Sequence, residues 1–392
     1  MKKLLVVLLV LGLAAPAMAA DFFFYGSIRN HLGYFKASED FIGGPGMDGT
    51  IAGGAGAVGE DSDSGTLLSI GTSTRIGAKA VASDKLTAIV EIGFQETSRT
   101  AGQIQDVYLR QIFGIWNFGA GKLLAGKTYT PGTFLGYSNS HGDMGDSGDA
   151  NLLVQGLPYI GRQPLLELQF GTFELAFIEN NSTAPTYTVG GVALTDRDFY
   201  LPRVEAAYVF RTPVLALRPV LGFQTYKVEN AAGTVDESIT SYLAGLGVSV
   251  TLGPAYVKAT ASYMQNAGNY GQTQLQLVNP LVAITNAQAV GADIEDSKLL
   301  QATLVVGMKF NPAFGIEAGI SYANAQVDIA AGVEAEQTGF YYYLQAPIAV
   351  AKGVQIIPEI GWLDRGDLER TGAADLDNGK LAFLDVNFRI DF

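Results

Sequence analysis

Hydrophobic and polar residues alternate one by one along much of this chain. In the stretch FLDVNFRIDF, residues 383–392, the even-numbered positions are all hydrophobic, whereas each position between them carries a charge or an amide. Successive side chains of a β-strand point to opposite faces, so this pattern predicts a strand with one apolar and one polar face. A water-soluble antiparallel sheet would give the same pattern, so the rest of the chain has to show whether water or lipid meets the apolar face.

The alternation recurs in segments that turn residues separate. It is clearest at 22–37, 66–82, 85–95, 298–310, 314–323, 340–350 and 354–363. Short turns lie at 83–84, 118–121, 171–172, 211–213, 253–254, 311–313 and 352–353, and longer polar or glycine-rich stretches lie at about 37–64, 98–104, 129–162, 181–198, 229–237, 267–297, 327–337 and 364–379. Seven short and eight long connections predict sixteen antiparallel strands, with the short turns on one rim and the long loops on the other. A β-sandwich has no reason to alternate its connections so regularly.

The first residues follow a different pattern. The stretch MKKLLVVLLVLGLAAPAMAAD begins with Lys2 and Lys3, continues with an apolar core and has a small-residue cleavage site at 17–19. This is the pattern of a secretory signal peptide of the bacterial type. We therefore predict that residues 1–19 are removed and that residues 20–392 form a single domain.

The composition favours a membrane barrel over a soluble sheet. Charged residues make up 16% of the chain, against about 25% in soluble domains. The part after residue 19 has no apolar run near the roughly 20 residues that a spanning helix needs. An exported chain of this kind satisfies its backbone groups in lipid by closing a barrel. We therefore predict an all-β fold, a transmembrane antiparallel β-barrel of 16 strands with short periplasmic turns and long extracellular loops, in the outer membrane of a Gram-negative bacterium.

Charge and residue content exclude several classes of function. The formal net charge of −13, or −15 once Lys2 and Lys3 are gone, argues against nucleic acid as a partner. With no Cys and two His, the chain has little for zinc ligation or nucleophile activation, and it has no nucleophile-elbow or phosphate-binding motif. We expect no enzymatic activity and no cofactor. A surface Ca²⁺ site at 60–63 or at the aspartates of 143–149 stays open.

Several segments resemble Gram-negative general porins. The segment STRIGAKAVASDKLTAIVEIGFQE, residues 73–96, resembles the second and third strands of that family, an Arg-Ile-Gly hairpin followed by an alternating strand. The segment GAGKLLAGKTYTPG, residues 119–132, resembles the stretch that leads into the family's long third loop. A C-terminal strand that ends in Phe is similar to the family's recognition signal for the machinery that inserts barrels. The predicted strand count extends the likeness over residues 20–392.

The resemblance implies a pore constriction. In such porins the third loop folds into the barrel, and acidic residues on the loop face basic residues on the wall. The loop would be about 130–161 here; it lacks the family's usual Pro-Glu-Phe-Gly-type motif, and its aspartates can equally form a solvated turn. The implied acidic residues are Asp143, Asp146 and Asp149, and the implied basic wall residues are Arg29, Arg75, Lys79, Arg110 and Lys127. The implied assembly signal is Phe392 with Ile390 and Phe388.

The resemblance and the charge together predict a function. We expect a water-filled channel for passive diffusion of ions and small hydrophilic solutes, with a mild cation preference because of the net acidity and the loop aspartates. The expected partners are the lipid bilayer, lipopolysaccharide, the barrel-insertion machinery and two further copies of the chain in a homotrimer. Two alternatives stay open: a solute-specific channel, and a structural or adhesive barrel with a blocked lumen whose loops at 37–64 and 267–297 bind a partner.

Overall fold

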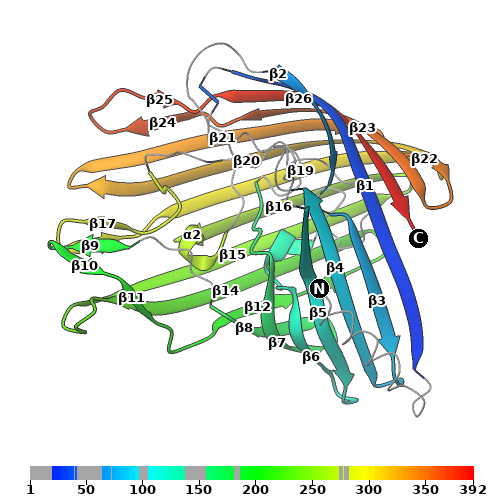
Figure 1. Cartoon of the computed structure of the whole chain (residues 1–392), viewed down its shortest axis with the longest axis horizontal. Helices are drawn as coiled ribbons and strands as arrows, with labels where there is room; N and C mark the ends of the chain where they lie inside the picture. The colour runs from blue at the N-terminus through cyan, green and yellow to red at the C-terminus, as the bar shows by residue number, and fades with distance from the viewer. Residues whose placement is uncertain are drawn as a thin grey trace.

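A single antiparallel sheet closes on itself into a barrel of 16 strands, which confirms the predicted fold class (Figure 1). The structure is a computed structural model, and it describes residues 20–38, 40–41, 64–71, 73–96, 105–136, 156–180, 186–272, 277 and 282–392. The first strand, β1 (Asp21–Ala37), pairs with the last, β26 (Lys380–Asp391), in continuous register from Ser27 opposite Asp391 to Ala37 opposite Leu381. This pairing is the seam that closes the barrel.

The strands follow one another around the barrel in chain order, and several consist of more than one segment. After β1 come β2 (Ser64–Ile70) with β3 (Arg75–Val81), β4 (Leu86–Glu96), β5 (Gln105–Asn117), β6 (Lys122–Tyr129), β7 (Arg162–Phe170) and β8 (Phe173–Ile178). Next come β11 (Asp196–Asp198), β12 (Arg203–Tyr208) and β13 (Phe210–Arg211) as one broken strand, then β14 (Leu215–Glu229), β15 (Asp236–Leu252), β16 (Ala255–Gln265), β19 (Lys298–Asn311) and β20 (Phe314–Ala330). The last are β21 (Val333–Gln345) with β22 (Ile348–Ala351), β23 (Val354–Asp364) with β24 (Asp367–Arg370), and β25 (Leu376–Asp377) with β26.

A few short elements belong to the connections. Two small hairpins are formed by β9 (Tyr187–Val189) with β10 (Val192–Leu194) and by β17 (Gln288–Val290) with β18 (Asp293–Glu295). A 3₁₀ turn, η2 (Thr133–Gly136), follows β6, and a one-turn helix, α2 (Ala267–Tyr270), follows β16. No helix within the described ranges is long and apolar enough to cross a membrane.

The two faces of each strand differ as the alternation predicted. In β1, Ile28 and Leu32 are exposed on the outside of the barrel, whereas Arg29 and His31 are fully buried on the inside. The closing strand β26 repeats this pattern, with Leu384 exposed and Asp385 buried. An apolar exterior around a polar interior is the arrangement that lipid requires of a barrel.

One predicted loop is wrong. The polar stretch 327–337 is not a long connection, because β20 continues to Ala330 and β21 begins at Val333. A tight turn joins the two strands, and Gly332 there has a φ of +73°, a conformation that favours glycine. Val327 and Ala335 are buried against an apolar cluster inside the barrel, which holds the extended hairpin in place. Similarly, β24 and β25 form a hairpin within the predicted loop 364–379.

Part of the inner wall is apolar, and two connections pack against it. The described ends of the connection between β6 and β7, residues 130–136 and 156–161, bring Leu135 and Ile160 to this patch. The connection between β16 and β19 brings Ala267 and Tyr270 of α2, which lies within the ring of strands in Figure 1. The wall contributes Ala207, Val220, Leu243, Met264, Leu299, Ala323, Ala325, Val327, Ala335 and Leu368. The predicted outer loop 267–297 is therefore corrected: its described residues near α2 fold inward.

Candidate pore wall

Five arginines approach one another on the inner wall and are called the arginine wall here. They come from the last strand and from the first half of the barrel: Arg389 of β26, Arg29 of β1, Arg75 of β3, Arg110 of β5 and Arg162 of β7. The register pairs Arg29 with Arg389 and places Arg75 opposite Ser27. Arg29, Arg75, Arg110 and Arg389 are each more than nine-tenths buried within the chain.

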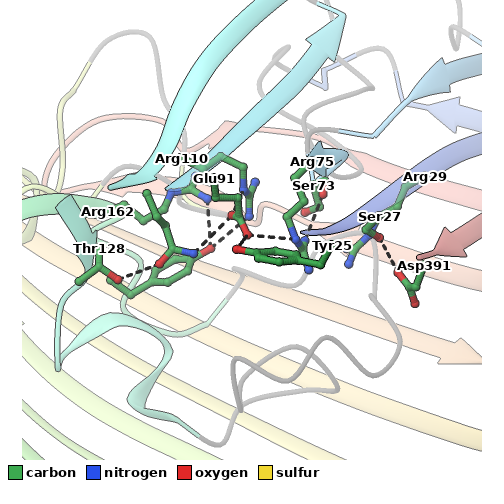
Figure 2. Close-up of polar contacts among 12 residues, drawn as sticks. Tyr25, Ser27, Arg29, Ser73, Arg75, Glu91, Arg110, Thr128, Arg162 and Asp391 are labelled. Atoms are coloured by element: carbon green, nitrogen blue, oxygen red, sulfur yellow. Dashed lines mark hydrogen bonds and ion pairs between the residues drawn. The ribbon is translucent and has the colours of Figure 1, made fainter. Parts of the chain in front are cut away.

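Glu91 on β4 is the central counter-ion of this wall (Figure 2). Arg110 Nε donates to Glu91 Oε1 at 2.7 Å, and Arg75 Nε lies 3.4 Å from Oε2. The hydroxyl of Tyr25 donates to Oε2 at 3.2 Å, and Gln111 Nε2 donates to Oε1 at 3.3 Å. One carboxylate is thus shared by two guanidinium groups and two neutral donors.

Asp391 is the second counter-ion and lies at the seam. Ser27 Oγ donates to Asp391 Oδ1 at 2.7 Å, and Arg29 Nε donates to that Ser27 oxygen at 3.0 Å. Arg389 Nε donates to Asp391 Oδ2 at 2.8 Å. Among the described residues of this network, five guanidinium groups accompany the two carboxylates Glu91 and Asp391.

Tyrosine hydroxyls accept hydrogen bonds from Arg110 and Arg162 at the β7 end of the arginine wall. Arg110 Nη2 donates to the hydroxyl of Tyr129 at 3.5 Å, and Arg162 Nη1 donates to the same oxygen at 3.2 Å. The guanidinium of Arg162 also lies over the Tyr129 ring, 5.1 Å from its centroid. Arg162 Nη2 donates to the hydroxyl of Tyr159, in the connection between β6 and β7, at 3.5 Å, and burial raises the pKa of Tyr159 to about 12. The Tyr159 phenol therefore stays neutral at physiological pH.

A row of three carboxylates and one amide, called the carboxylate row here, crosses the C-terminal strands next to the arginine wall. The register pairs each member with the next across β20, β21, β23 and β26, in the order Glu317, Gln345, Glu359 and Asp385. All four side chains are buried on the inner face. Because β26 adjoins β1, the arginine wall and this row lie side by side at the seam.

Tyrosines and a histidine hold the carboxylate row in place. The hydroxyls of Tyr256 and Tyr343 donate to the two oxygens of Glu317 at 2.6 and 2.8 Å. His31 Nδ1 lies 2.7 Å from Asp385 Oδ2, and both side chains are almost fully buried. These contacts fix the carboxylates against the wall.

The structure brings three of the predicted wall residues together and separates a fourth. Arg29, Arg75 and Arg110 share the network around Glu91 and Asp391. Lys79 lies farther along β3, toward the short-turn rim, where it lines a cavity of about 310 Å³ with Asp84, Thr87, Ile89, Ile115, Asn117, Lys85 and Lys122. Lys79 therefore belongs to the mouth of the barrel.

Lys127 requires a correction. The register pairs Lys127 with Ile112 on one side and Pro164 on the other. Ile112 is 49% exposed on the outer face, and Pro164 is exposed as well. Cross-strand partners share a face, so Lys127 lies on the outer face, while the inward position beside it belongs to Thr128, which bonds Gln111.

The predicted acidic residues Asp143, Asp146 and Asp149 lie outside the described residues, as does the possible Ca²⁺ site at 60–63. The part of the chain that the structure describes contains no cluster of three or more His, Asp or Glu side chains that could hold a metal ion.

Sequence reasoning did not single out Arg162 or Arg389 as wall residues, nor the register that brings Glu317, Glu359 and Asp385 into one row. Arg389 occupies a polar position of the final alternating strand, so its inward orientation was predictable. Its position opposite Arg29 was not, because that pairing depends on the register across the closed seam.

The C-terminal residue takes part in the seam. Phe392 N donates to the carbonyl oxygen of Gly26 at 3.1 Å, and Gly26 N donates to the backbone oxygen of Phe392 at 2.9 Å. The ring of Phe392 lies where a side chain at Gly26 would be, and it is 62% exposed. Phe388 and Ile390 are exposed on the outer face of the same strand. The proposed assembly residues thus form an apolar outer edge beside the closure.

No protein-family model matches this chain, and no curated protein matches it. Solved structures do match over nearly the whole length. The outer-membrane channel DcaP of Acinetobacter baumannii is 13% identical, covers 95% of this chain and 97% of its own, and has a TM-score of 0.63. The trimer form of OmpT, an outer-membrane protein of Vibrio cholerae, is 16% identical over 95% and 100%, with a TM-score of 0.51. An anion-selective porin from Comamonas acidovorans is 11% identical over 95% and 100%, with a TM-score of 0.50. The chain therefore has the fold of outer-membrane porins.

Proposed function

We propose that this chain forms a water-filled channel in the outer membrane of a Gram-negative bacterium, through which ions and small hydrophilic solutes diffuse passively. The observation that carries the proposal is the arginine wall with Glu91 and Asp391 inside a closed barrel. Moving charges out of water costs several kcal/mol for each ion even after relaxation. A hydrated lumen avoids that cost, so the charged wall favours an open path over a blocked one.

The membrane setting is part of the same proposal. The barrel has an apolar exterior, and the first 19 residues have the pattern of an export signal. We propose that the outer face contacts lipid and lipopolysaccharide, that the chain assembles as a homotrimer, and that the insertion machinery binds the strand ending in Phe392. The trimer form of OmpT, which shares this fold, supports the trimer.

The ion preference has two candidates. Cation preference is the one predicted from Asp143, Asp146 and Asp149. Anion preference is favoured by the five guanidinium groups of the arginine wall, and one protein of the same fold is an anion-selective porin. A solute-specific channel would use the same wall to select its substrate.

The reversal potential of the purified protein in a planar bilayer under a KCl gradient tests these proposals. Discrete conductance steps are expected. A potential that favours cations supports control by the loop aspartates, and one that favours anions gives control to the arginine wall. If folded protein conducts nothing, the channel proposal is wrong and the structural or adhesive barrel replaces it.

A further inference from the structure

The helix α2 is fastened to the inner wall by Asn269, which is fully buried. Asn269 Nδ2 donates to the hydroxyls of Tyr187 and Tyr226 at 2.7 and 3.0 Å. Its Oδ1 accepts from the amide of Ala287 at 2.8 Å, and its backbone carbonyl accepts from Gln224 Nε2 at 2.9 Å. A side chain that uses its whole amide in this way fixes the position of the segment that carries it. We call residues 266–272 the inner segment.

Tyr270 of the inner segment shares a partner with the connection after β6. Its hydroxyl donates to Glu205 Oε1 at 3.1 Å, and Gly132 N donates to Glu205 Oε2 at 2.7 Å. Arg203 Nη1 donates to the carbonyl of Tyr270 at 2.7 Å, and its guanidinium lies 4.9 Å from the ring centroid. Burial raises the pKa of Tyr270 well above its usual value, so the hydroxyl remains a donor. Glu205 therefore holds the inner segment and residues 130–136 from one wall position.

Gln272 connects the inner segment directly to the other end of that connection. Its Nε2 donates to the carbonyl of Leu157 at 3.1 Å, and its Oε1 accepts from Tyr159 N at 3.0 Å. Leu157 is fully buried, and Gln272 is 5% exposed. The 156–161 end of the connection thus bonds the inner segment directly, although more than a hundred residues separate the two in sequence, and the 130–136 end shares Glu205 with it.

We propose that the inner segment is a second internal element of the pore. In this proposal Gln272 and Asn269 are positioning residues: Asn269 fixes the inner segment, Gln272 holds residues 156–161 to it, and together they set the size limit of the channel. The effect on the size limit rests on the proposed channel function, whereas the positioning role of the two residues does not. Thr303, Thr133 and Gln163 also bond this segment, so without Gln272 or Asn269 residues 156–161 lose one of several supports, and the cross-section that they leave free changes.

Two readouts on mature protein refolded in lipid vesicles test the proposal. The first is hydrogen exchange of residues 156–161, followed by mass spectrometry, which does not depend on conduction. The second is the size limit for neutral sugars, measured by vesicle swelling. The variants are Gln272→Ala and Asn269→Ala, together with Tyr270→Phe, which removes only the hydroxyl. Gln288→Ala is the matched control, because Gln288 lies in the same connection and bonds the carbonyls of Ala283 and Asn286.

For Gln272→Ala, we expect exchange at 156–161 to rise roughly tenfold, as the loss of a buried hydrogen bond would cause, and larger sugars to enter. Gln288→Ala should match the parent in both readouts. Unchanged exchange in folded Gln272→Ala and Asn269→Ala would overturn the positioning role. Raised exchange with an unchanged size limit, in a conducting parent protein, would overturn the role in pore size. A parent protein that admits no sugar would contradict the channel proposal and leave the exchange result to decide the positioning.

Discussion

The ring of Tyr343 crosses Gly319 on the neighbouring strand and delivers its hydroxyl to Glu317. Tyr256 does the same from the other side, crossing Gly307 to reach the second oxygen of Glu317. A Cβ at either glycine would clash with the tyrosine ring. The glycines thus let two aromatic rings lie flat on the wall and fix a carboxylate of the lumen.

The first prediction concerns Gly319. In Gly319→Ala the new methyl group forces Tyr343 away, so we expect a loss of about 1–3 kcal/mol in the free energy of unfolding, the usual cost of overpacking. Denaturant unfolding in lipid vesicles, followed by tryptophan fluorescence, measures it. Gly114→Ala is the matched control, because a Cβ at Gly114 meets only the carbonyl oxygen of Thr87, at 3.8 Å. Equal stabilities of the two variants would contradict the packing argument.

The second prediction concerns Glu91. The variant Glu91→Gln keeps the shape of the side chain and removes the negative charge between Arg75 and Arg110. A unit charge at about 4 Å in water changes the energy of an ion by about 1 kcal/mol, so the permeability ratio should move toward anions by up to roughly fivefold. The reversal potential in a KCl gradient measures the ratio.

Glu369 provides the control for this charge change. It is exposed on β24, so Glu369→Gln removes the same charge outside the arginine wall and should move the potential far less. A shift of the same size in both variants would mean that total charge, and not the arginine wall, sets the preference.

The third prediction concerns the outer face. Leu304 lies near the middle of β19 and is 45% exposed, whereas Phe310 lies near the end of the same strand. An Arg at the bilayer midplane costs about 2–4 kcal/mol, and the cost falls to roughly 0–1 kcal/mol near the interface. We therefore expect Leu304→Arg to destabilise the barrel in vesicles much more than Phe310→Arg does. Equal effects would show that this face does not meet the hydrocarbon core.

The fourth prediction separates assembly from stability at Phe392. The variant Phe392→Ala keeps the backbone hydrogen bonds with Gly26, so refolding of the purified chain in detergent should stay close to normal. If Phe392 is the signal for the insertion machinery, the amount of folded barrel in cells should fall severalfold. Phe310→Ala, another aromatic on the outer face, serves as control. A parallel loss in detergent and in cells would assign Phe392 a structural role only.

The sequence was sufficient to predict the barrel and the face on which most side chains lie, because alternation is a local property. Arg29 and Arg75 lie in alternating segments, whereas Arg110 was predicted on the inner wall only from the resemblance to porins. Some apolar residues, such as Leu299, face inward, where a polar interior was expected. Their packing partners lie on connections distant in sequence, so no local pattern predicts them.

The same dependence on distant partners explains the two wrong connections. Asp328 and Glu334 suggested a loop at 327–337, yet they pair across an extended hairpin that the neighbouring Val327 and Ala335 anchor to the inner apolar cluster. The inward path of residues 266–272 depends on contacts with β12, β14 and β15, which no local pattern encodes.

The seam has a kinetic consequence. It joins residues 27–37 with residues 381–391, while every other pair of neighbouring barrel strands is consecutive along the chain. Bringing such distant segments together costs roughly 5 kcal/mol of chain entropy from loop length alone, and contacts of this sequence separation form slowly. Closure therefore comes last in folding, after the hairpins have formed. A chain halted before that step presents β1 and β26 as two unpaired edges, each a template for a strand of another molecule.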